Sequence, residues 1–279
     1  MPTHNRLLRK LVHNEQAQGV REARNARHTE VREGFESAAI THLPSGVEYG
    51  MGSNRKLALP LVAASLLASD FLHLQNQIYT LKEAGVDMIH IDVMDGHFVP
   101  CITFGPCIIS AISSICAIPI DIHLMISNID SVYLDYLNLG ATHLAFHLEA
   151  SADPEGLITT IKKSNNKIKL GVALKPNTPI QNIASLLPIL DNVLVMSVEP
   201  GKCGQDVLYD QVKKVEWLNN RMSDRQLIFV DGGMNANSAK EFITAGTNVV
   251  VSGSYLFNED GQGYQARVNK LRNACKTSI

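Results

Sequence analysis

Short apolar runs and longer amphipathic stretches alternate along the chain from residue 57 onward. Eight of the short runs are rich in β-branched and other apolar side chains, which predicts buried strands. These runs span residues 59–65, 87–93, 119–125, 142–148, 168–174, 192–198, 226–232 and 248–253. Because strands that are apolar on both faces are typical of a parallel sheet covered by helices, the pattern predicts an α/β fold.

The segments between these runs repeat apolar residues at helical spacing. We expect helices within residues 71–85, 106–115, 129–140, 154–164, 179–190, 207–222, 236–246 and 263–276. Eight strand–helix units in about 220 residues predict a (β/α)₈ TIM barrel with eight parallel strands. An open, doubly wound sheet is the alternative, but it usually has fewer strands, and no GxGxxG motif follows the first strand.

The first fifty residues differ from the rest of the chain. They carry six Arg and one Lys against six Glu, with few large apolar residues and no sustained helical period. Because such a segment has little apolar surface to bury, we expect residues 1–56 to form a disordered extension and residues 57–279 to form the barrel. Six Glu also argue against a transit peptide, which is poor in acidic residues. An alternative is that the working protein starts at Met51.

Composition argues against certain partners, and it indicates the redox state of the compartment. Charged residues make up 19% of the chain and the formal net charge is −2, so no nucleic-acid partner is expected. No apolar run reaches about 18 residues, so no membrane-spanning helix is expected. The five cysteines are odd in number and form no CxxC pair, which favours a reducing compartment over a disulfide framework. We therefore expect a cytoplasmic protein.

Polar side chains occur at or just after the end of every predicted strand, which is the edge where TIM barrels carry their active sites. One polar strand end is ordinary, whereas eight indicate a site. In strand order the residues are Ser65, His90 with Asp92, His123, His147 with Glu149, Lys175, Ser197 with Glu199, Asp231, and Gly253 with Ser254.

His90 and Asp92 are two residues apart on one strand, so their side chains share one face. Such a pair alone is more often a satisfied polar pair near a strand end. With His123 and Asp231 added, two imidazoles and two carboxylates meet at one mouth. This set suits one divalent cation, Zn²⁺ or Fe²⁺ first and Mn²⁺ or Co²⁺ as alternatives, with positions left open for substrate oxygens.

Asp92 and Asp231 lie three strands apart in a ring of eight and therefore approach a central ligand from roughly opposite sides. Two carboxylates that face one carbon suit proton removal on one face and proton return on the other. A divalent cation on the neighbouring oxygens would stabilise an enediolate. We expect the two carboxyls to titrate as a coupled pair. Nearby, Met94, Met125 and Met196 are expected to pack in the core; if they line the site, they would exclude water from it.

Glycine-bearing loops follow the sixth, seventh and eighth strands: VEPGKCGQD (198–206), VDGGMN (230–235) and VSGSYLF (251–257). Glycines let backbone N–H groups approach an anion closely, and the loops after strands seven and eight often bind phosphate in TIM barrels. Each loop alone is compatible with a plain turn. Three converging loops predict a phosphorylated substrate.

These residues and loops resemble the ribulose-phosphate 3-epimerase family. The motifs ASLLASDF, HIDVMDGHFVP, ITFGP, DIHLM, HLEAS, MSVEPG..GQ, VDGGMN and VSGS follow the family's order along residues 57–279. The resemblance implies a barrel of the ribulose-phosphate-binding type and a homo-oligomer. It also implies interconversion of D-ribulose 5-phosphate and D-xylulose 5-phosphate, in the pentose phosphate pathway or a photosynthetic carbon cycle.

The resemblance carries roles over to named residues. The metal ligands would be His90, Asp92, His123 and Asp231. Asp92 would be the proton acceptor and Asp231 the proton donor. The residues that contact the phosphorylated ketose would be Ser65, His123, Gly201, Lys202, Cys203, Gly204, Asp231, Gly232, Gly233, Gly253 and Ser254.

Three motifs depart from the family's usual pattern. The loop PGFGGQ is PGKCGQ here, with Lys202 and Cys203 in place of Phe and Gly. If position 203 requires a positive φ, Cys would cost on the order of 1 kcal/mol and crowd the anion, whereas Lys202 either adds positive charge or faces solvent. Cys101 replaces the usual Asn of VPN, which removes a side-chain hydrogen bond, and AAS replaces APS before the first strand ends. None of these changes removes an expected ligand or proton carrier.

Two alternatives to the pentulose enzyme remain open. One is a hexulose-phosphate 3-epimerase that acts on allulose 6-phosphate and shares the metal site, although VDGG favours the pentulose enzyme. The other is a paralogue that binds sugar phosphate without catalysis, which the altered PGKCGQ loop suggests.

Overall fold

The computed structural model describes residues 60–258 and 261–275. The expected N-terminal extension, residues 1–56, lies outside the described residues, so its disorder stays a prediction. Within the described part of the chain, no helix has the length and apolar character needed to cross a membrane. All five cysteines are free thiols.

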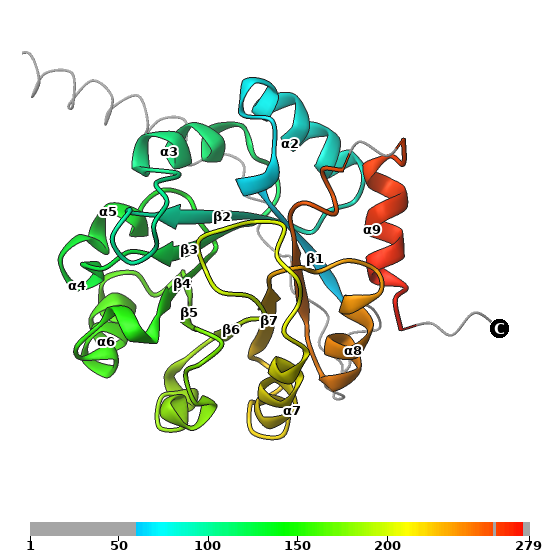
Figure 1. The fold of residues 1–279 in the computed structure, drawn as a ribbon. Coiled ribbons are helices and arrows are strands. Elements are labelled where there is room, and N and C mark those ends of the chain that lie inside the picture. Colours follow the sequence, from blue (N-terminus) through cyan, green and yellow to red (C-terminus); the bar gives the residue numbers. More distant parts are fainter. Residues whose placement is uncertain (1–59, 259–260, 276–279) are drawn as a thin grey trace, which may run out of the picture. The chain divides into compact units, whose positions relative to one another are not determined.

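Eight parallel strands close into one barrel in chain order (Figure 1). Every predicted strand is observed, with boundaries shifted by two residues at most, and the closed ring excludes the open doubly wound alternative. The strands are β1 (Leu61–Ser65), β2 (Met88–Met94), β3 (Ile120–Met125), β4 (His143–His147), β5 (Lys169–Leu174), β6 (Asn192–Met196), β7 (Leu227–Asp231) and β8 (Val249–Ser252).

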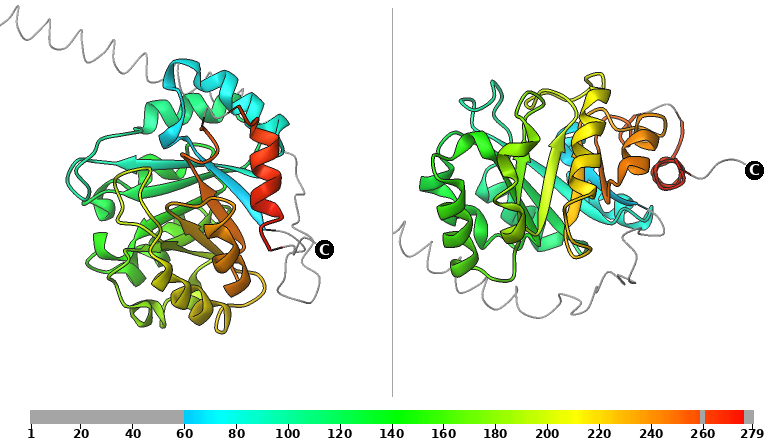
Figure 2. Two further views of the ribbon diagram at one scale, coloured as in Figure 1. Left: turned by 45° about the vertical axis from the view of Figure 1, so that its right-hand side comes forward. Right: turned by 90° about the horizontal axis from the view of Figure 1, so that it is seen from below.

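Helices surround the barrel on its outside, as the views in Figure 2 show. The α-helices are α2 (Leu74–Glu83), α3 (Pro106–Ile115), α4 (Ile129–Val132), α5 (Leu134–Leu137), α6 (Pro154–Ser164), α7 (Val212–Asn219), α8 (Ser238–Ala245) and α9 (Tyr264–Arg272). Short 3₁₀ turns are η1 (Leu66–Ala68), η2 (Phe71–His73), η3 (Leu148–Ala150), η4 (Ile180–Ile183), η5 (Leu187–Ile189) and η6 (Tyr209–Gln211).

Two of the expected helices differ from the elements that the structure contains. Residues 179–190 form the two 3₁₀ turns η4 and η5 instead of one α-helix. Pro188 explains the break, because proline inside a helix has no N–H to donate and its ring clashes with the carbonyl four residues earlier. Residues 129–140 form two short helices, α4 and α5, which are separated at Tyr133.

The barrel wall separates the apolar core between strands and helices from the interior of the barrel, as β2 shows. Ile89, Ile91 and Val93 belong to the large core between strands and helices. Because side chains alternate across a strand, His90 and Asp92 point to the other side, into the barrel. The register then places Asp92 beside His123 of β3, so the wall itself brings the two side chains together.

Candidate active site

Four side chains from three strands meet at the C-terminal end of the barrel. His90 and Asp92 come from β2, His123 from β3 and Asp231 from β7. One potential ligand atom from each residue lies within 4.8 Å of all the others. The Asp231 side chain is 15% exposed and the other three are almost fully buried, so the cluster is accessible from one direction.

Asp92 lies at the centre of the cluster. Its Oδ1 is 3.2 Å from His90 Nε2 and 3.1 Å from His123 Nδ1, while its Oδ2 accepts a hydrogen bond of 2.7 Å from Ser65 Oγ. Asp231 Oδ2 is 3.8 Å from His90 Nε2 and 3.9 Å from His123 Nδ1. One nitrogen of each histidine and one oxygen of each aspartate therefore face a common centre.

The outward-facing nitrogens of the two histidines have partners of their own. His90 Nδ1 is 2.7 Å from Asp121 Oδ2, and His123 Nε2 is 2.9 Å from His147 Nε2. Contacts of this kind orient imidazoles that bind metal ions. Asp121 was missed in the sequence, although a carboxylate two residues before His123 in an apolar strand was a signal for it.

The donor set fits a divalent transition-metal ion. Two imidazole nitrogens and two carboxylate oxygens are typical ligands of Zn²⁺ and Fe²⁺, and Mn²⁺ and Co²⁺ accept the same groups. The ligand atoms converge from buried side chains that are already oriented by neighbours. The structure thus brings together all four residues that the sequence analysis selected as metal ligands.

The electrostatic environment shifts the two aspartates in opposite directions. Burial raises the pKa of Asp231, and the neighbouring Asp92 carboxylate raises it further. Burial also acts to raise the pKa of Asp92, but charge on His90 and hydrogen bonds with His123 and His90 outweigh it and hold this pKa well below its usual range. One carboxyl of the pair is therefore biased toward the protonated form and the other toward the ionised form.

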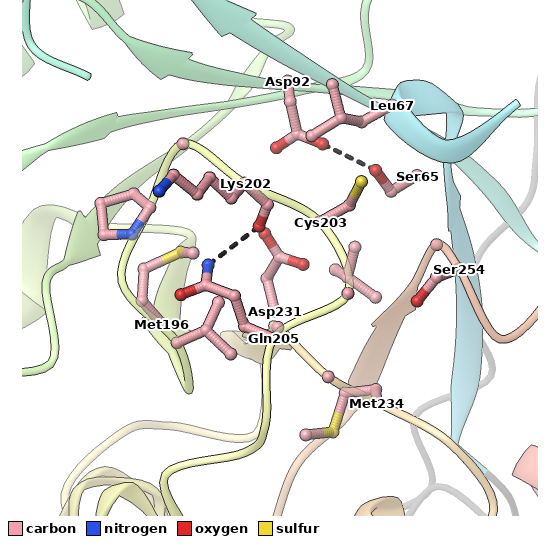
Figure 3. Close-up of a pocket in the computed structure, with 18 of the residues that line it drawn as sticks. Ser65, Leu67, Asp92, Met196, Lys202, Cys203, Gln205, Asp231, Met234 and Ser254 are labelled. Carbon is pink, nitrogen blue, oxygen red and sulfur yellow. Dashed lines mark hydrogen bonds between the residues drawn. The ribbon is translucent and has the colours of Figure 1, made fainter. Parts of the chain in front are cut away.

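A pocket opens beside the cluster (Figure 3). It encloses about 520 Å³ of empty space, part of it open to solvent, which is within the usual range for small-molecule sites. His123 is fully buried and belongs to the cluster instead of the lining. All the other expected substrate contacts line the pocket: Ser65, Gly201, Lys202, Cys203, Gly204, Asp231, Gly232, Gly233, Gly253 and Ser254.

The backbone of the loop after β7 forms part of the pocket lining. Gly232 has a φ of 115° and Gly233 a φ of 64°, values that side-chain-bearing residues rarely adopt. A Cβ atom on Gly232 would lie 2.5 Å from Val198 Cγ2, and one on Gly233 would lie 2.6 Å from Val207 Cγ2. Glycine is therefore required at both positions for the loop after β7 to pack against the loop after β6.

Gln205 closes the loop after β6 and was not selected from the sequence. Its Nε2 donates hydrogen bonds to the carbonyl oxygens of Glu199 at 2.7 Å and Lys202 at 2.9 Å. The second of these bonds is drawn in Figure 3. These two contacts join the beginning and the middle of the loop. The glutamine that ends the PGKCGQ motif thus has a structural part in shaping the pocket.

The two unusual residues of this loop are exposed and line the pocket. No described residue other than glycine has a positive φ. Cys203 therefore has no left-handed backbone strain, and the energetic cost expected for Cys at a positive φ does not apply. In Figure 3 the Cys203 side chain points toward Ser65, whereas the Lys202 side chain extends away from Ser254. The Lys202 ammonium group is therefore not directed at the loop after β8.

Met94, Met125 and Met196 are buried and also line the pocket, and Met234 lines it with them. Their thioether side chains place an apolar surface beside the polar cluster. Cys101 packs against the small apolar group that contains Met94 and Met125. Its backbone carbonyl accepts a hydrogen bond of 2.9 Å from the N–H of residue 96, so the loop is closed there by backbone atoms.

Known proteins that are similar to this chain indicate its family. Residues 61–257 match the model of the ribulose-phosphate 3 epimerase family. The chain belongs to this family. It is 41% identical over 203 residues to the ribulose-phosphate 3-epimerase of Bacillus subtilis, with 71% of this chain and 92% of that protein covered. It is 38% identical over 200 residues to the ribulose-phosphate 3-epimerase of Treponema pallidum, with coverage of 71% and 91%.

The ribulose-phosphate 3-epimerase motifs quoted from the sequence all fall within the matched residues, so the resemblance is confirmed. Members of this family are isomerases that act on carbohydrates. More distant solved structures show the fold alone. A 3-hexulose-6-phosphate synthase aligns with a TM-score of 0.54 at 18% identity, covering 77% of this chain and 99% of that chain.

Proposed function

We propose that this protein interconverts D-ribulose 5-phosphate and D-xylulose 5-phosphate by moving the proton at C3 through an enediolate, as a step of the pentose phosphate pathway. The observation that carries the proposal is the meeting of Asp92 and Asp231 with two histidines at one pocket whose lining includes glycine loops. Family membership supports the same reaction, because the named relatives are ribulose-phosphate 3-epimerases.

The two aspartates are the proposed proton carriers. They project from β2 and β7, which are three strands apart in the closed ring, so they face a ligand from opposite sides. The lowered pKa of Asp92 favours its ionised form, which a proton acceptor requires, and the raised pKa of Asp231 favours its protonated form, which a proton donor requires. In the reverse reaction the two residues exchange roles. Removal of a proton on one face and its return on the other inverts C3.

One divalent ion, Zn²⁺ or Fe²⁺ or alternatively Mn²⁺ or Co²⁺, would be held by His90, Asp92, His123 and Asp231. When bound, such an ion stabilises negative charge on the carbonyl and hydroxyl oxygens next to the reacting carbon. The chain itself keeps these ligands oriented through burial and through the Ser65 hydrogen bond to Asp92. The methionines around the pocket limit the access of water to the reacting carbon.

The phosphate group is proposed to lie against the glycine loops, and the sugar against Ser65. His123, also expected to touch the sugar, is fully buried in the cluster and does not line the pocket. Backbone N–H groups at glycines with positive φ form concave surfaces that suit anions. The residues proposed to contact the phosphate are Gly201, Gly204, Gly232, Gly233, Gly253 and Ser254, and Lys202 and Cys203 are further proposed substrate contacts.

The homo-oligomer and the cytoplasmic location belong to the same proposal. Free cysteines throughout the chain are consistent with a reducing compartment. No nucleic-acid partner is expected from a formal net charge of −2.

The test is an epimerase assay in deuterated water with the full chain and a divalent ion. D-ribulose 5-phosphate should yield D-xylulose 5-phosphate with deuterium at C3. Turnover of allulose 6-phosphate alone would favour the hexulose enzyme. Tight binding of the pentulose phosphate without exchange would favour a non-catalytic paralogue.

A further inference from the structure

His147 and Glu149 are not used by the proposed reaction, yet they contact its metal site. His147 ends β4 and is fully buried. Its Nε2 is 2.9 Å from His123 Nε2, and its Nδ1 is 3.2 Å from Glu149 Oε2. The two residues therefore extend a line of contacts from the metal cluster outward to a carboxylate.

Glu149 is itself fixed in place by the loop after β5. Its Oε1 accepts hydrogen bonds from the backbone N–H of Lys175 at 3.0 Å and from Thr178 Oγ1. The other oxygen, Oε2, is thereby aimed at His147. A carboxylate held on one side in this way offers a fixed acceptor on the other.

The His147 ring also packs near two other rings. Its centroid is 4.8 Å from that of Phe98 and 5.0 Å from that of His123, with both pairs of rings tilted. Lys175 Nζ lies 3.8 Å from the Phe98 centroid. Ring packing and hydrogen bonding thus both restrain His147, and a test has to separate the two.

The contacts allow a complete assignment of protons when an ion is bound. A neutral imidazole carries one N–H and one lone pair. If His123 Nδ1 gives its lone pair to the ion, the proton of His123 is on Nε2 and is donated to His147 Nε2. The proton of His147 must then be on Nδ1, where it is donated to Glu149. Each donor in this series of hydrogen bonds meets an acceptor, and each ring nitrogen of His123 and His147 has a partner.

We propose that His147 and Glu149 are positioning residues that hold His123 in the Nε2–H form, so that its Nδ1 lone pair faces the metal site. This inference rests on the proposed function, which places an ion among the four clustered residues. The second histidine ligand, His90, has direct support from Asp121 at 2.7 Å. His123 receives the equivalent support from Glu149 through an intervening imidazole.

The first test uses the unsubstituted full chain loaded with Zn²⁺. Nitrogen-15 NMR of the histidine side chains should show the proton of His123 on Nε2 and that of His147 on Nδ1. The opposite form of His147, with the proton on Nε2, overturns the inference, because that nitrogen is then unable to accept from His123. This readout needs no folded variant and no turnover.

The second test measures Co²⁺ affinity and the visible absorption spectrum of the bound Co²⁺. His147→Phe keeps an aromatic ring but removes both nitrogens, and should weaken Co²⁺ binding by about 10- to 100-fold and change the spectrum. His147→Gln places an amide oxygen near the position of Nε2 and should restore most of the affinity. Phe98→Leu is the matched control: it removes the ring that packs against His147, keeps the hydrogen bonds, and should leave affinity and spectrum unchanged.

The outcomes separate this inference from the proposed function. Wild-type affinity and spectrum in His147→Phe overturn the inference alone, as does a loss in Phe98→Leu equal to that in His147→Phe. Failure of the unsubstituted protein to bind Co²⁺ or Zn²⁺ overturns the proposed metal site, and this inference with it.

Discussion

The two ends of the pocket are built in different ways. At the proposed metal end, formed by His90, Asp92, His123 and Asp231, buried side chains from the barrel wall supply the chemical groups, and strand register sets their spacing. At the proposed phosphate end, formed by the loops after β6, β7 and β8, loop backbone supplies the surface, and glycines at 232 and 233 permit the close packing of two loops. The metal end therefore depends on which functional groups are present, whereas the phosphate end depends on shape.

Charge divides the two ends in the same way. The metal end concentrates two imidazoles and two carboxylates in a small buried volume. Among the described residues that line the pocket, Lys202 alone has a cationic side chain, and it extends away from Ser254. We therefore expect changes at the metal end to affect catalytic rate, and changes at the phosphate end to affect mainly substrate binding.

Removal of the metal should give the largest effect. Chelator-treated protein is expected to lose turnover by on the order of 10³-fold or more, because charge stabilisation by a metal ion contributes several kcal/mol. Addition of Zn²⁺ or Fe²⁺ should restore it, as measured by a coupled epimerase assay with metal analysis. Full activity in protein that contains no detectable metal would contradict the metal role.

Substitution of either proposed proton carrier should give the second-largest loss of activity. Asp92→Asn and Asp231→Asn are each expected to slow exchange of the C3 proton with solvent by about 10²- to 10⁴-fold, the usual contribution of acid–base catalysis. Deuterium incorporation followed by NMR measures this loss, and circular dichroism checks that the barrel is intact. Because both residues are also proposed ligands, bound metal has to be measured in each variant. Ordinary exchange in either variant would refute the acid–base assignment.

The barrel was predictable from the sequence because its signals are local. Each apolar run is bounded by polar or glycine residues, and each lies within two residues of an observed strand. The prediction of one α-helix over residues 179–190 was wrong. Their apolar composition favours a helix, but Pro188 prevents one from forming. The position of a proline should have outweighed the count of apolar residues there.

The metal end was more predictable than the groups that support it. His90, Asp92 and His123 stand out as polar residues in apolar strands, and parallel topology brings such residues together. The contacts of Asp121 and Gln205 depend on side-chain direction and loop closure, which sequence spacing does not specify. Cys203 shows the same limit, since its φ is known only once the loop conformation is known.

Ser65→Ala tests the metal end at a residue that is not a proposed ligand. The change removes the 2.7 Å hydrogen bond to Asp92 Oδ2. Hydrogen bonds to charged groups contribute about 1.5–3 kcal/mol, so we expect kcat to fall by about 10- to 100-fold. Steady-state kinetics with D-ribulose 5-phosphate measure the effect. An unchanged kcat would show that Asp92 is oriented without Ser65.

Paired glycine substitutions test the phosphate end. Gly232→Ala places a Cβ 2.5 Å from Val198 at a φ of 115°, so we expect strain of about 1–3 kcal/mol and a KM raised by about 10-fold. Gly263→Ala is the matched control, because nothing lies within 4 Å of its Cβ, its φ of −67° suits alanine, and it does not line the pocket. Urea unfolding and KM measurements compare the two. Equal effects of both substitutions would mean that close packing of the loops does not shape this end.

Reversion of the unusual loop should have the smallest effect. The double change Lys202→Phe with Cys203→Gly restores the family's usual PGFGGQ sequence. Because Cys203 adopts an ordinary φ and Gln205 closes the loop through backbone carbonyls, neither native side chain is needed for the observed loop conformation. We therefore expect kcat and KM to change by less than about threefold, equivalent to less than about 0.7 kcal/mol. A rise from no activity to full activity on reversion would instead identify the native loop as the defect of a non-catalytic paralogue, and the two ends of the pocket would then be equally decisive for catalysis.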